Sequence, residues 1–314
     1  KCDWHVEPIG GMVFVTVVMG TPWVAIQRNP RSGAGRRRRE LVELCCALRR
    51  HSIVPRLFRD RDELDARVRE PVSRQNLVAI VAAGGDGTVV DVVNRHSDVP
   101  MAVLPLGTEN LLARFLGLPR DGRGLGEVIA NGCTREIDVG RANGQLFTLV
   151  ASAGFDAFIA HELDRVRSGH ITHMSYIQPI WKALRRYKYP TMHVYLDDNP
   201  DPIDGVEVMV SNLPAYGMRL KVGNTAREDD GRFVVTVLQR GSAFQMIRYS
   251  IKLWRGTHDL AKDVQVVKAR KVRIVPVEPG RGPVPFQVDG DPAGEVPVEL
   301  ECLPGSLRVF VPGE

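Results

Sequence analysis

Cysteine and long apolar stretches are scarce in this chain. Its 314 residues include only five cysteines, and their spacings fit neither a metal site nor a disulfide framework. The eight histidines show no metal-ligand spacing either. We therefore expect a protein of a reducing, cytoplasmic compartment without a zinc site. The apolar stretch Gly11 to Met19 is too short to span a bilayer, and it lacks the basic segment and cleavage site of a signal peptide.

The composition is that of a globular protein with an ample core. Hydrophobic residues make up 44% of the chain and charged residues 25%, and the length suggests about two domains. The net charge of +5 gathers in local runs, of which Arg36 to Arg39 is the densest. This run is either the solvated face of a helix or a surface that attracts phosphates or anionic lipid headgroups. No nucleic-acid partner is expected.

Apolar strands alternate with helices in the first part of the chain. Strands are predicted at 23–28, 53–58, 77–83 and 101–104, and helices at 35–50, 62–70, 88–96, 107–117 and 124–131. This alternation predicts a parallel α/β domain over residues 22–136.

Short strands dominate the rest of the chain. They are predicted near 135–141, 145–152, 191–197, 205–211, 233–239, 264–268, 272–277, 286–288, 297–302 and 306–311, with helices near 172–188 and 243–255. The pair Asn143-Gly144 is a strong hairpin signal. We predict a mostly antiparallel β-rich domain over 137–299, and a C-terminal segment of about 300–314 that packs back on the first domain.

The most informative stretch is Gly84-Gly85-Asp86-Gly87-Thr88, between a buried-type strand and a predicted helix. Its glycines let the backbone approach a ligand closely, and the N–H groups and dipole of the helix start favour an anion. Asp86 beside a phosphate makes sense if Mg²⁺ bridges the two. The sequence thus predicts a metal–nucleotide site, the alternative being a tight turn capped by Thr88.

Two further strands end in small polar turns. Asn29-Pro30-Arg31-Ser32-Gly33-Ala34-Gly35 follows the first strand, and Pro105-Leu106-Gly107-Thr108-Glu109-Asn110 follows the strand at 101–104. In a parallel sheet the turns after the strands share one edge, which is where ligands bind.

Taken in their order along the chain, these three turns resemble the diacylglycerol kinase catalytic domain family, which includes bacterial lipid kinases and eukaryotic sphingosine and ceramide kinases. The resemblance covers about 290 residues, from near Trp23 to the end. It continues through Gly154-Phe155-Asp156-Ala157, Ser211-Asn212, Asp230-Gly231 and Val288-Asp289-Gly290-Asp291. The first turn is shared with NAD kinases and 6-phosphofructokinases, whereas the Pro-Leu-Gly-Thr-x-Asn turn and the late Asp-Gly-Asp are more specific.

The resemblance implies an ATP site in a cleft between the α/β domain and the β-rich domain, with Mg²⁺ held near Asp86. The ATP-binding residues that it implies are Asn29, Ser32, Gly33, Gly35, Gly84, Gly85, Asp86, Gly87, Thr88, Gly107, Thr108 and Asn110. Phosphoryl transfer needs positioned phosphates, a metal that neutralises charge, and an acceptor for the proton of the attacking hydroxyl.

The turn Asp289-Gly290-Asp291 is the candidate for that proton acceptor. Two carboxylates that point into one small space repel each other, which raises one pKa and favours proton uptake. The alternative is an exposed hairpin turn. The family more often has Glu where this chain has Asp291, and the shorter side chain leaves open whether Asp289 or Asp291 is the base.

A second, structural Mg²⁺ is implied at Asp230 by similarity to some bacterial relatives. Its other ligands would be the backbone carbonyls of Arg227 and Arg232. A surface turn of unliganded acidic residues is the alternative.

Two segments with interleaved aromatic and basic residues, Ser175 to Tyr187 and Phe244 to Trp254, suit the surface of an anionic membrane. Ordinary core-facing helices look similar.

The sequence therefore predicts an ATP-dependent lipid kinase that works peripherally at the inner, cytoplasmic face of a membrane, with a homodimer left open. Diacylglycerol, a sphingoid base, an isoprenoid alcohol and a glycolipid all remain as acceptors. The alternatives are an NAD kinase-like enzyme and a nucleotide- or lipid-binding regulator without catalysis.

Overall fold

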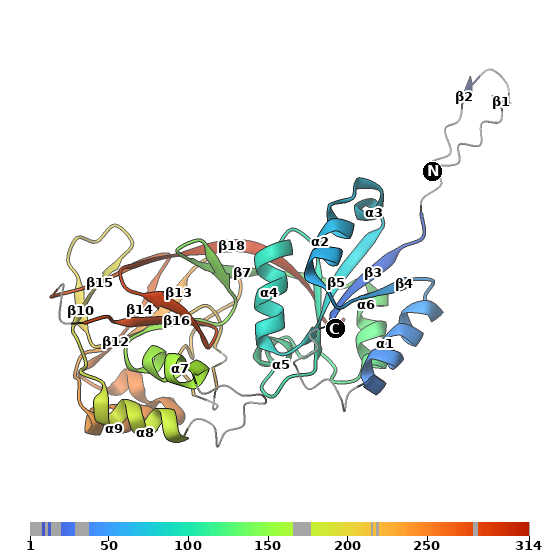
Figure 1. The fold of residues 1–314 in the computed structure, drawn as a ribbon. Coiled ribbons are helices and arrows are strands. Elements are labelled where there is room, and N and C mark those ends of the chain that lie inside the picture. Colours follow the sequence, from blue (N-terminus) through green and yellow to red (C-terminus); the bar gives the residue numbers. More distant parts are fainter. Residues whose placement is uncertain are drawn as a thin grey trace.

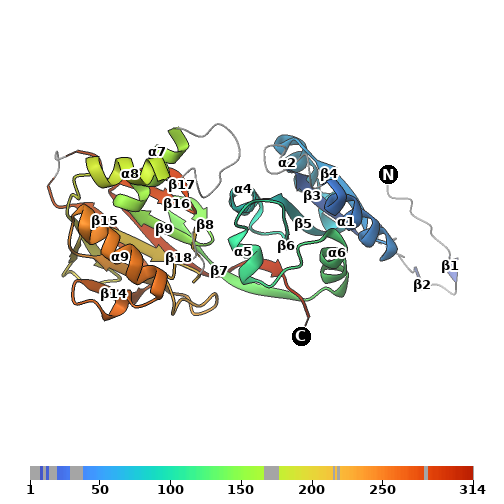
Figure 2. The same cartoon turned by 90° about the horizontal axis from the view of Figure 1, so that it is seen from below.

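The computed structural model has two lobes, an α/β lobe and a β-rich lobe (Figures 1 and 2). It describes residues 8–9, 12–13, 20–28, 38–165, 177–214, 216–217, 220–278 and 282–313. Within the first two of these ranges, β1 (Pro8–Ile9) pairs with β2 (Met12–Val13). The predicted phosphate loop from Asn29 to Gly35 lies outside the described residues, as do Arg36 and Arg37.

The α/β lobe contains a parallel sheet. Its strands are β3 (Trp23–Arg28), β4 (Val54–Phe58), β5 (Leu77–Gly84) and β6 (Met101–Pro105), in the order β4-β3-β5-β6. Register pairs such as Ala25 with Ile80 and Ile80 with Met101 are parallel throughout. The inner strands are buried along their length, as expected of a sheet covered on both faces. The predicted parallel α/β sheet is confirmed.

In the described part of the chain, six helices accompany this sheet. They are α1 (Arg38–Arg50), α2 (Arg61–Arg69), α3 (Pro71–Gln75), α4 (Asp86–His96), α5 (Leu111–Phe115) and α6 (Gly122–Asn131). Side-chain caps set two of the starts, because Asp60 accepts backbone N–H bonds at α2 and Asp121 accepts one at α6. The helix predicted at 107–117 is shorter than expected, since Asn110 has a left-handed backbone (φ 50°) that no α-helix continues through.

The β-rich lobe is a sandwich of two sheets. One is antiparallel, in the order β14-β13-β12-β9-β16-β17. Its strands are β9 (Val150–Ala153), β12 (Glu207–Ser211), β13 (Phe233–Leu238), β14 (Val264–Ala269), β16 (Pro285–Val288) and β17 (Asp291–Glu295). The other sheet in this lobe contains β7 (Thr134–Ala142), β8 (Gln145–Phe147), β10 (Met192–Leu196), β11 (Ile203–Gly205), β15 (Lys271–Pro276) and the first part of β18 (Val298–Phe310). The predicted antiparallel second domain is thus confirmed.

The predicted hairpin between β7 and β8 is present. Ala142 pairs with Gln145, and the two residues between them, Asn143 and Gly144, both have the positive φ that a tight hairpin turn needs. Helix α7 (Phe155–Arg165) was not predicted. The strands predicted at 297–302 and 306–311 are one strand, β18, interrupted by a bulge between Leu303 and Leu307.

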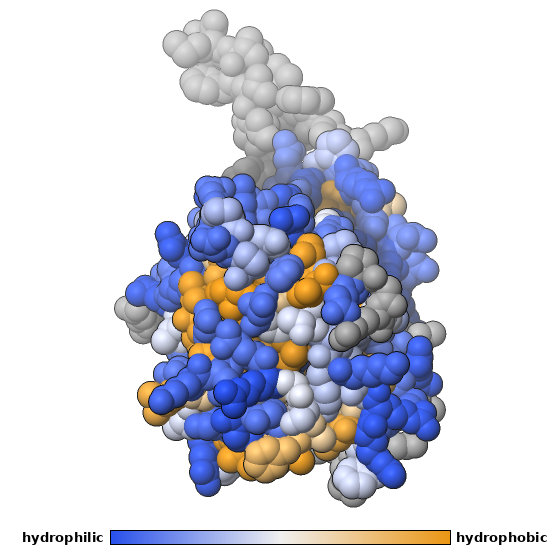
Figure 3. Space-filling model, turned by 90° about the vertical axis from the view of Figure 1, so that its left-hand side faces the viewer, coloured by the Kyte–Doolittle hydropathy of each residue, from blue (hydrophilic) through white to orange (hydrophobic). Residues whose placement is uncertain are grey.

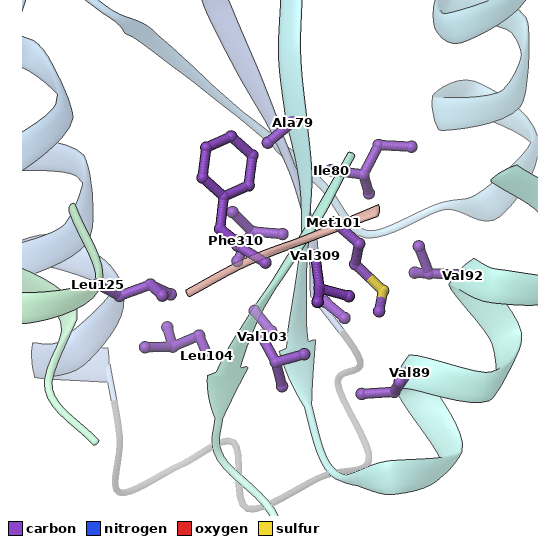
Figure 4. Packing of buried hydrophobic residues seen from close by; sticks show 14 of the residues in the cluster. Ala79, Ile80, Val89, Val92, Met101, Val103, Leu104, Leu125, Val309 and Phe310 are labelled. Carbon is purple, nitrogen blue, oxygen red and sulfur yellow. The ribbon is translucent and has the colours of Figure 1, made fainter. Parts of the chain in front are cut away.

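Strands β7 and β18 connect the two lobes. They pair antiparallel from Leu300–Ala142 to Phe310–Thr134, so β7 runs across the predicted boundary at 136/137. Beyond the bulge, β18 joins the α/β sheet through a parallel pairing of Val309 with Met101. Figure 4 shows Val309 on the side of Val92 and Phe310 on the side of Leu125, so the end of the chain is part of the α/β core.

Helices α8 (Ile177–Arg186) and α9 (Ala243–Arg255) lie on the lower edge of the β-rich lobe in Figure 1. A short 3-10 helix at His258–Leu260 follows α9 in the chain. Apolar side chains gather along the corresponding lower edge of the face in Figure 3. None of the helices in the described part of the chain is long and apolar enough to cross a membrane.

Candidate functional site

The turn Gly84 to Thr88 lies between the end of β5 and the start of α4. Helix α4 begins at Asp86, two residues earlier than predicted, with Gly85 as its N-cap residue. Gly87 is exposed, whereas Thr88 is buried. The Thr88 N–H already donates to the Gly85 carbonyl at 2.9 Å, so this turn offers an anion above Gly87 the exposed backbone of Gly87 and the positive end of the α4 dipole.

A second turn, Pro105 to Asn110, lies directly against the first. Leu106 N–H donates to the Gly84 carbonyl at 2.9 Å. The turns approach so closely that a Cβ on Gly107 would lie 2.5 Å from Gly85 Cα, so only glycine fits at position 107. Asn110 holds this turn by bonding both the N–H and the carbonyl of Gly107 at 2.8 Å. The structure therefore brings two of the three predicted glycine-containing turns together, with Thr108 exposed beside them.

Asp86 ties the two turns together. Its Oδ1 accepts the N–H of Leu111, the first residue of α5, at 2.7 Å. Burial raises the pKa of this carboxyl, and backbone N–H groups at the start of α5 work in the opposite direction. The side chain thus has a positioning contact that the sequence did not suggest.

Asp291 approaches the turn Gly84 to Thr88 from the β-rich lobe. A Cβ placed on Gly87 would lie 3.7 Å from Asp291 Oδ2. Asp291 is half-buried and begins β17, directly after the hairpin turn at Asp289 and Gly290. Residues about 200 positions apart in the chain thus meet beside Gly87.

Asp289 points elsewhere. Its carboxylate accepts backbone N–H groups of Thr148, Leu149 and Val150 at 2.8–2.9 Å and the Thr148 hydroxyl at 3.1 Å. Burial raises the pKa of Asp289 to about 6, against the opposing effect of these donors. The expected convergence of both carboxylates on one space is not found. Asp289 fixes the turn, and Asp291 faces Gly87.

Two asparagines to which the sequence analysis gave no role hold this arrangement. Asn94 of α4 makes two bonds with the backbone of Leu146, accepting its N–H at 2.8 Å and donating to its carbonyl at 2.9 Å. Buried Asn212 donates to the carbonyls of Asp138 and Thr148. The Ser211-Asn212 motif was the available signal for Asn212, while nothing in the local sequence marks Asn94.

The predicted second Mg²⁺ site does not fit the side chains as they lie. One carboxylate oxygen of Asp230 contacts the ammonium of Lys268 at 2.6 Å, and the other accepts the Arg232 N–H at 3.2 Å. Asp138, buried at 2% exposure, holds the same turn by accepting the N–H of Gly231 at 2.7 Å. A cation would have to displace Lys268, and the proposed carbonyl ligands Arg227 and Arg232 stay predictions.

The donor set near Gly87 does fit a Mg²⁺ that arrives with a nucleotide. Such an ion keeps most of its ligands from phosphates and water and needs one or two carboxylates. Asp86 is next to Gly87 in the chain, and Asp291 lies beside it in space. No cluster of three or more possible metal-ligating side chains occurs in the described ranges.

Two family descriptions match successive parts of the chain. The family description "Diacylglycerol kinase catalytic domain" matches residues 24–142, and "YegS C-terminal NAD kinase beta sandwich-like domain" matches 149–311. The chain is 28% identical over 250 residues to a diacylglycerol kinase of Mycobacterium tuberculosis, covering 74% of this chain and 77% of the relative. It is 24% identical over 291 residues to one of Staphylococcus aureus, covering 91% of each.

A crystal structure of a candidate diacylglycerol kinase from Bacillus anthracis has the same fold. The TM-score is 0.74 at 21% identity, with 93% of this chain and 95% of that chain covered. The two family matches together span both lobes, so the chain belongs to the diacylglycerol kinase family.

The raised pKa of Asp289 predicts how stability changes with pH. The folded protein binds this proton more tightly than the unfolded chain, because its pKa of about 6 exceeds the ordinary 3.8. The stabilisation of the folded protein by the protonated Asp289 is therefore full below about pH 4 and is lost as pH rises through about 6. The difference in unfolding free energy between wild type and Asp289→Asn should fall over this range, by on the order of 3 kcal/mol. Urea titrations at several pH values measure it, and a constant or rising difference would contradict the assignment.

Proposed function

We propose that this protein transfers the γ-phosphate of ATP to the hydroxyl of a lipid. The observation that carries the proposal is the position of Asp291 Oδ2, 3.7 Å from a Cβ placed on Gly87. It combines a phosphate-binding turn with a carboxylate that can accept a proton. Family membership supports a kinase, and the relatives from M. tuberculosis and S. aureus carry the name diacylglycerol kinase.

In this mechanism the phosphates of ATP lie over Gly84 to Thr88 and accept N–H groups from the start of α4. The lipid hydroxyl lies between the γ-phosphate and Asp291. Its oxygen forms a bond to phosphorus as the bond to the bridging oxygen of ADP breaks, and Asp291 takes the proton. A Mg²⁺ bound with the nucleotide would neutralise phosphate charge. Asp86 keeps the two glycine-containing turns together through Leu111.

The lipid is proposed to enter from a membrane that contacts α8 and α9. Helix α9 is apolar on two faces, because Met246, Tyr249 and Leu253 are buried while other large apolar residues face outward. Among the described side chains of both helices, the exposed large apolar ones are Trp181, Phe244, Ile247, Ile251 and Trp254. Basic side chains lie among them, including Arg185, Lys252 and Arg255. An apolar surface bordered by cations suits an anionic membrane.

A regulator that binds nucleotide or lipid without catalysis is the second candidate. It rests on Asp291, where the family more often has the longer Glu. A labelled-ATP assay on total lipid extract and on NAD separates the lipid kinase from this regulator and from an NAD kinase-like enzyme.

Asp291→Asn should lower kcat by about 10²–10⁴-fold while the affinity for ATP stays near that of wild type, because a general base acts in the transition state. Asp291→Glu should retain or raise activity. The matched control is Asp198→Asn, an exposed aspartate of the β-rich lobe. Phosphate transfer to lipid and nucleotide binding measure the two effects. Normal turnover in Asp291→Asn would remove the assignment of the base, and an inactive Asp289→Asn beside it would move the role to Asp289.

The membrane surface is tested by co-sedimentation with vesicles. The protein should bind acidic vesicles more than neutral ones, and added salt should weaken the binding, because headgroup attraction is screened. Replacing Trp181 and Trp254 together by alanine should reduce it further. Binding that ignores lipid charge, salt and these substitutions would argue against this surface.

A further inference from the structure

The hairpin turn that precedes Asp291 is held from two sides. Asp289 and Gly290 connect β16 to β17, and both have positive φ, 48° and 89°. On one side, the Asp289 carboxylate accepts the backbone N–H groups of 148–150. On the other side, the Gly290 N–H donates to Oε1 of Gln287 at 2.7 Å. Because Asp291 follows Gly290 directly, the position of the Gln287 amide affects where the proposed base lies.

The side chain of Gln287 is fully buried, and both ends of its amide are bonded. Its oxygen accepts the N–H of Gly290, while Nε2 donates to the Ser152 hydroxyl at 2.7 Å and to Asp156 Oδ2 at 3.1 Å. In the sheet, Gln287 pairs with Ser152 of β9. Asp156 belongs to α7, which packs against β16 and β17. A buried amide that is bonded at both ends cannot turn over without leaving polar groups unpaired.

Asp156 determines which way this amide faces. Its Oδ2 accepts from Gln287, from the Ser152 hydroxyl at 2.6 Å and from the hydroxyl of Tyr216. A carboxylate only accepts hydrogen bonds, so the NH₂ end of the amide must face Asp156 and its oxygen must face Gly290. In the reversed orientation two acceptors would meet at Asp156 and two donors at Gly290, so both hydrogen bonds would be lost.

The start of α7 holds Asp156 in place. The Asp156 N–H donates to Glu207 at 3.2 Å, and Glu207 is the buried first residue of the central strand β12. Gly154 has φ 123°, and a Cβ there would lie 2.5 Å from Glu207 Oε2. Only glycine suits this backbone and this close approach. The carboxylate that orients Gln287 is thus fixed to the middle of the antiparallel sheet.

We propose that Asp156 and Gln287 are positioning residues for phosphoryl transfer. Asp156 sets the orientation of the amide, and the amide fixes the turn at Gly290. Together they hold Asp291 against Gly87. The inference rests on the proposed lipid kinase activity, because it assigns these residues to the step in which Asp291 takes the proton.

Gln287→Glu tests the orientation with a side chain of almost the same shape. It places two carboxyl groups within hydrogen-bond distance, and they repel each other unless one of them holds a proton. With that proton, the new side chain still donates to Asp156 and accepts the Gly290 N–H. The ratio of the variant's kcat to that of wild type should therefore fall at least about tenfold as pH rises from about 5 to about 8, while KM for ATP stays unchanged.

Adding Asp156→Asn to Gln287→Glu should restore turnover over this pH range. The asparagine supplies the NH₂ group, so the new carboxylate accepts from both sides, including the N–H of Gly290. The double variant has the net charge of wild type, and its kcat should lie within about threefold of wild type. Asp156→Asn alone should also stay within about threefold, because its carbonyl oxygen can still accept the amide.

Gln287→Met removes both ends of the amide at similar volume. It should lower kcat about ten- to hundredfold because the base is misplaced, with KM for ATP unchanged. In the protein without substrates, the amide hydrogen of Gly290 should exchange about three- to tenfold faster, which NMR measures. The matched control is Gln265→Glu, on an exposed position of β14 in the same sheet. It should change neither kcat nor this exchange rate.

Normal turnover in Gln287→Met, a ratio for Gln287→Glu that does not depend on pH, or no recovery in the double variant would each overturn the inference. If Gln287→Met does not fold, the other two results decide it. Failure of the kinase proposal looks different: wild type would phosphorylate no lipid at any pH, whereas the exchange of the Gly290 amide would still respond to Gln287→Met.

Discussion

The antiparallel pairing of β7 with β18 is the constraint on which the site depends. These strands run through both lobes, and the far end of β18 enters the parallel sheet at Met101. The bulge that lets β18 do this is held by Asp138, whose carboxylate accepts the N–H of Gly305 at 2.9 Å. Because both strands continue from one lobe into the other, their pairing fixes which parts of the β-rich lobe lie next to the parallel sheet. This is why Asp291 of the β-rich lobe can reach Gly87 in the turn Gly84 to Thr88.

Polar contacts connect these strands to the carboxylates that are proposed to react. Helix α4 begins in the turn Gly84 to Thr88, and Asn94 of this helix bonds to the backbone of Leu146. The next residues, Thr148 to Val150, bond the carboxylate of Asp289, and Asp291 follows two residues later. Each of these hydrogen bonds contributes only about 0.5–1.5 kcal/mol to stability. Their main effect is to fix the positions of the side chains and backbone that they join. They position one carboxylate against a turn from another part of the chain.

The sequence predicted the parts of the molecule that follow from local patterns. The parallel strands, the Asn143-Gly144 hairpin and the turn at Gly84 to Thr88 were visible because apolar runs and glycines mark them. The division of roles between Asp289 and Asp291 was not, since it depends on which backbone lies opposite each side chain. Asn94 was missed for the same reason, because its importance comes from its contacts with the backbone of Leu146, which is distant in the sequence.

The most direct test of the account is a crystal structure with Mg²⁺ and a non-hydrolysable ATP analogue. The account predicts that the β- and γ-phosphates accept N–H groups from the start of α4, with the γ-phosphate between Gly87 and Asp291. Asp289 should remain bonded to the 148–150 backbone. A triphosphate bound away from this turn, or an Asp291 that faces away from the γ-phosphate, would contradict it.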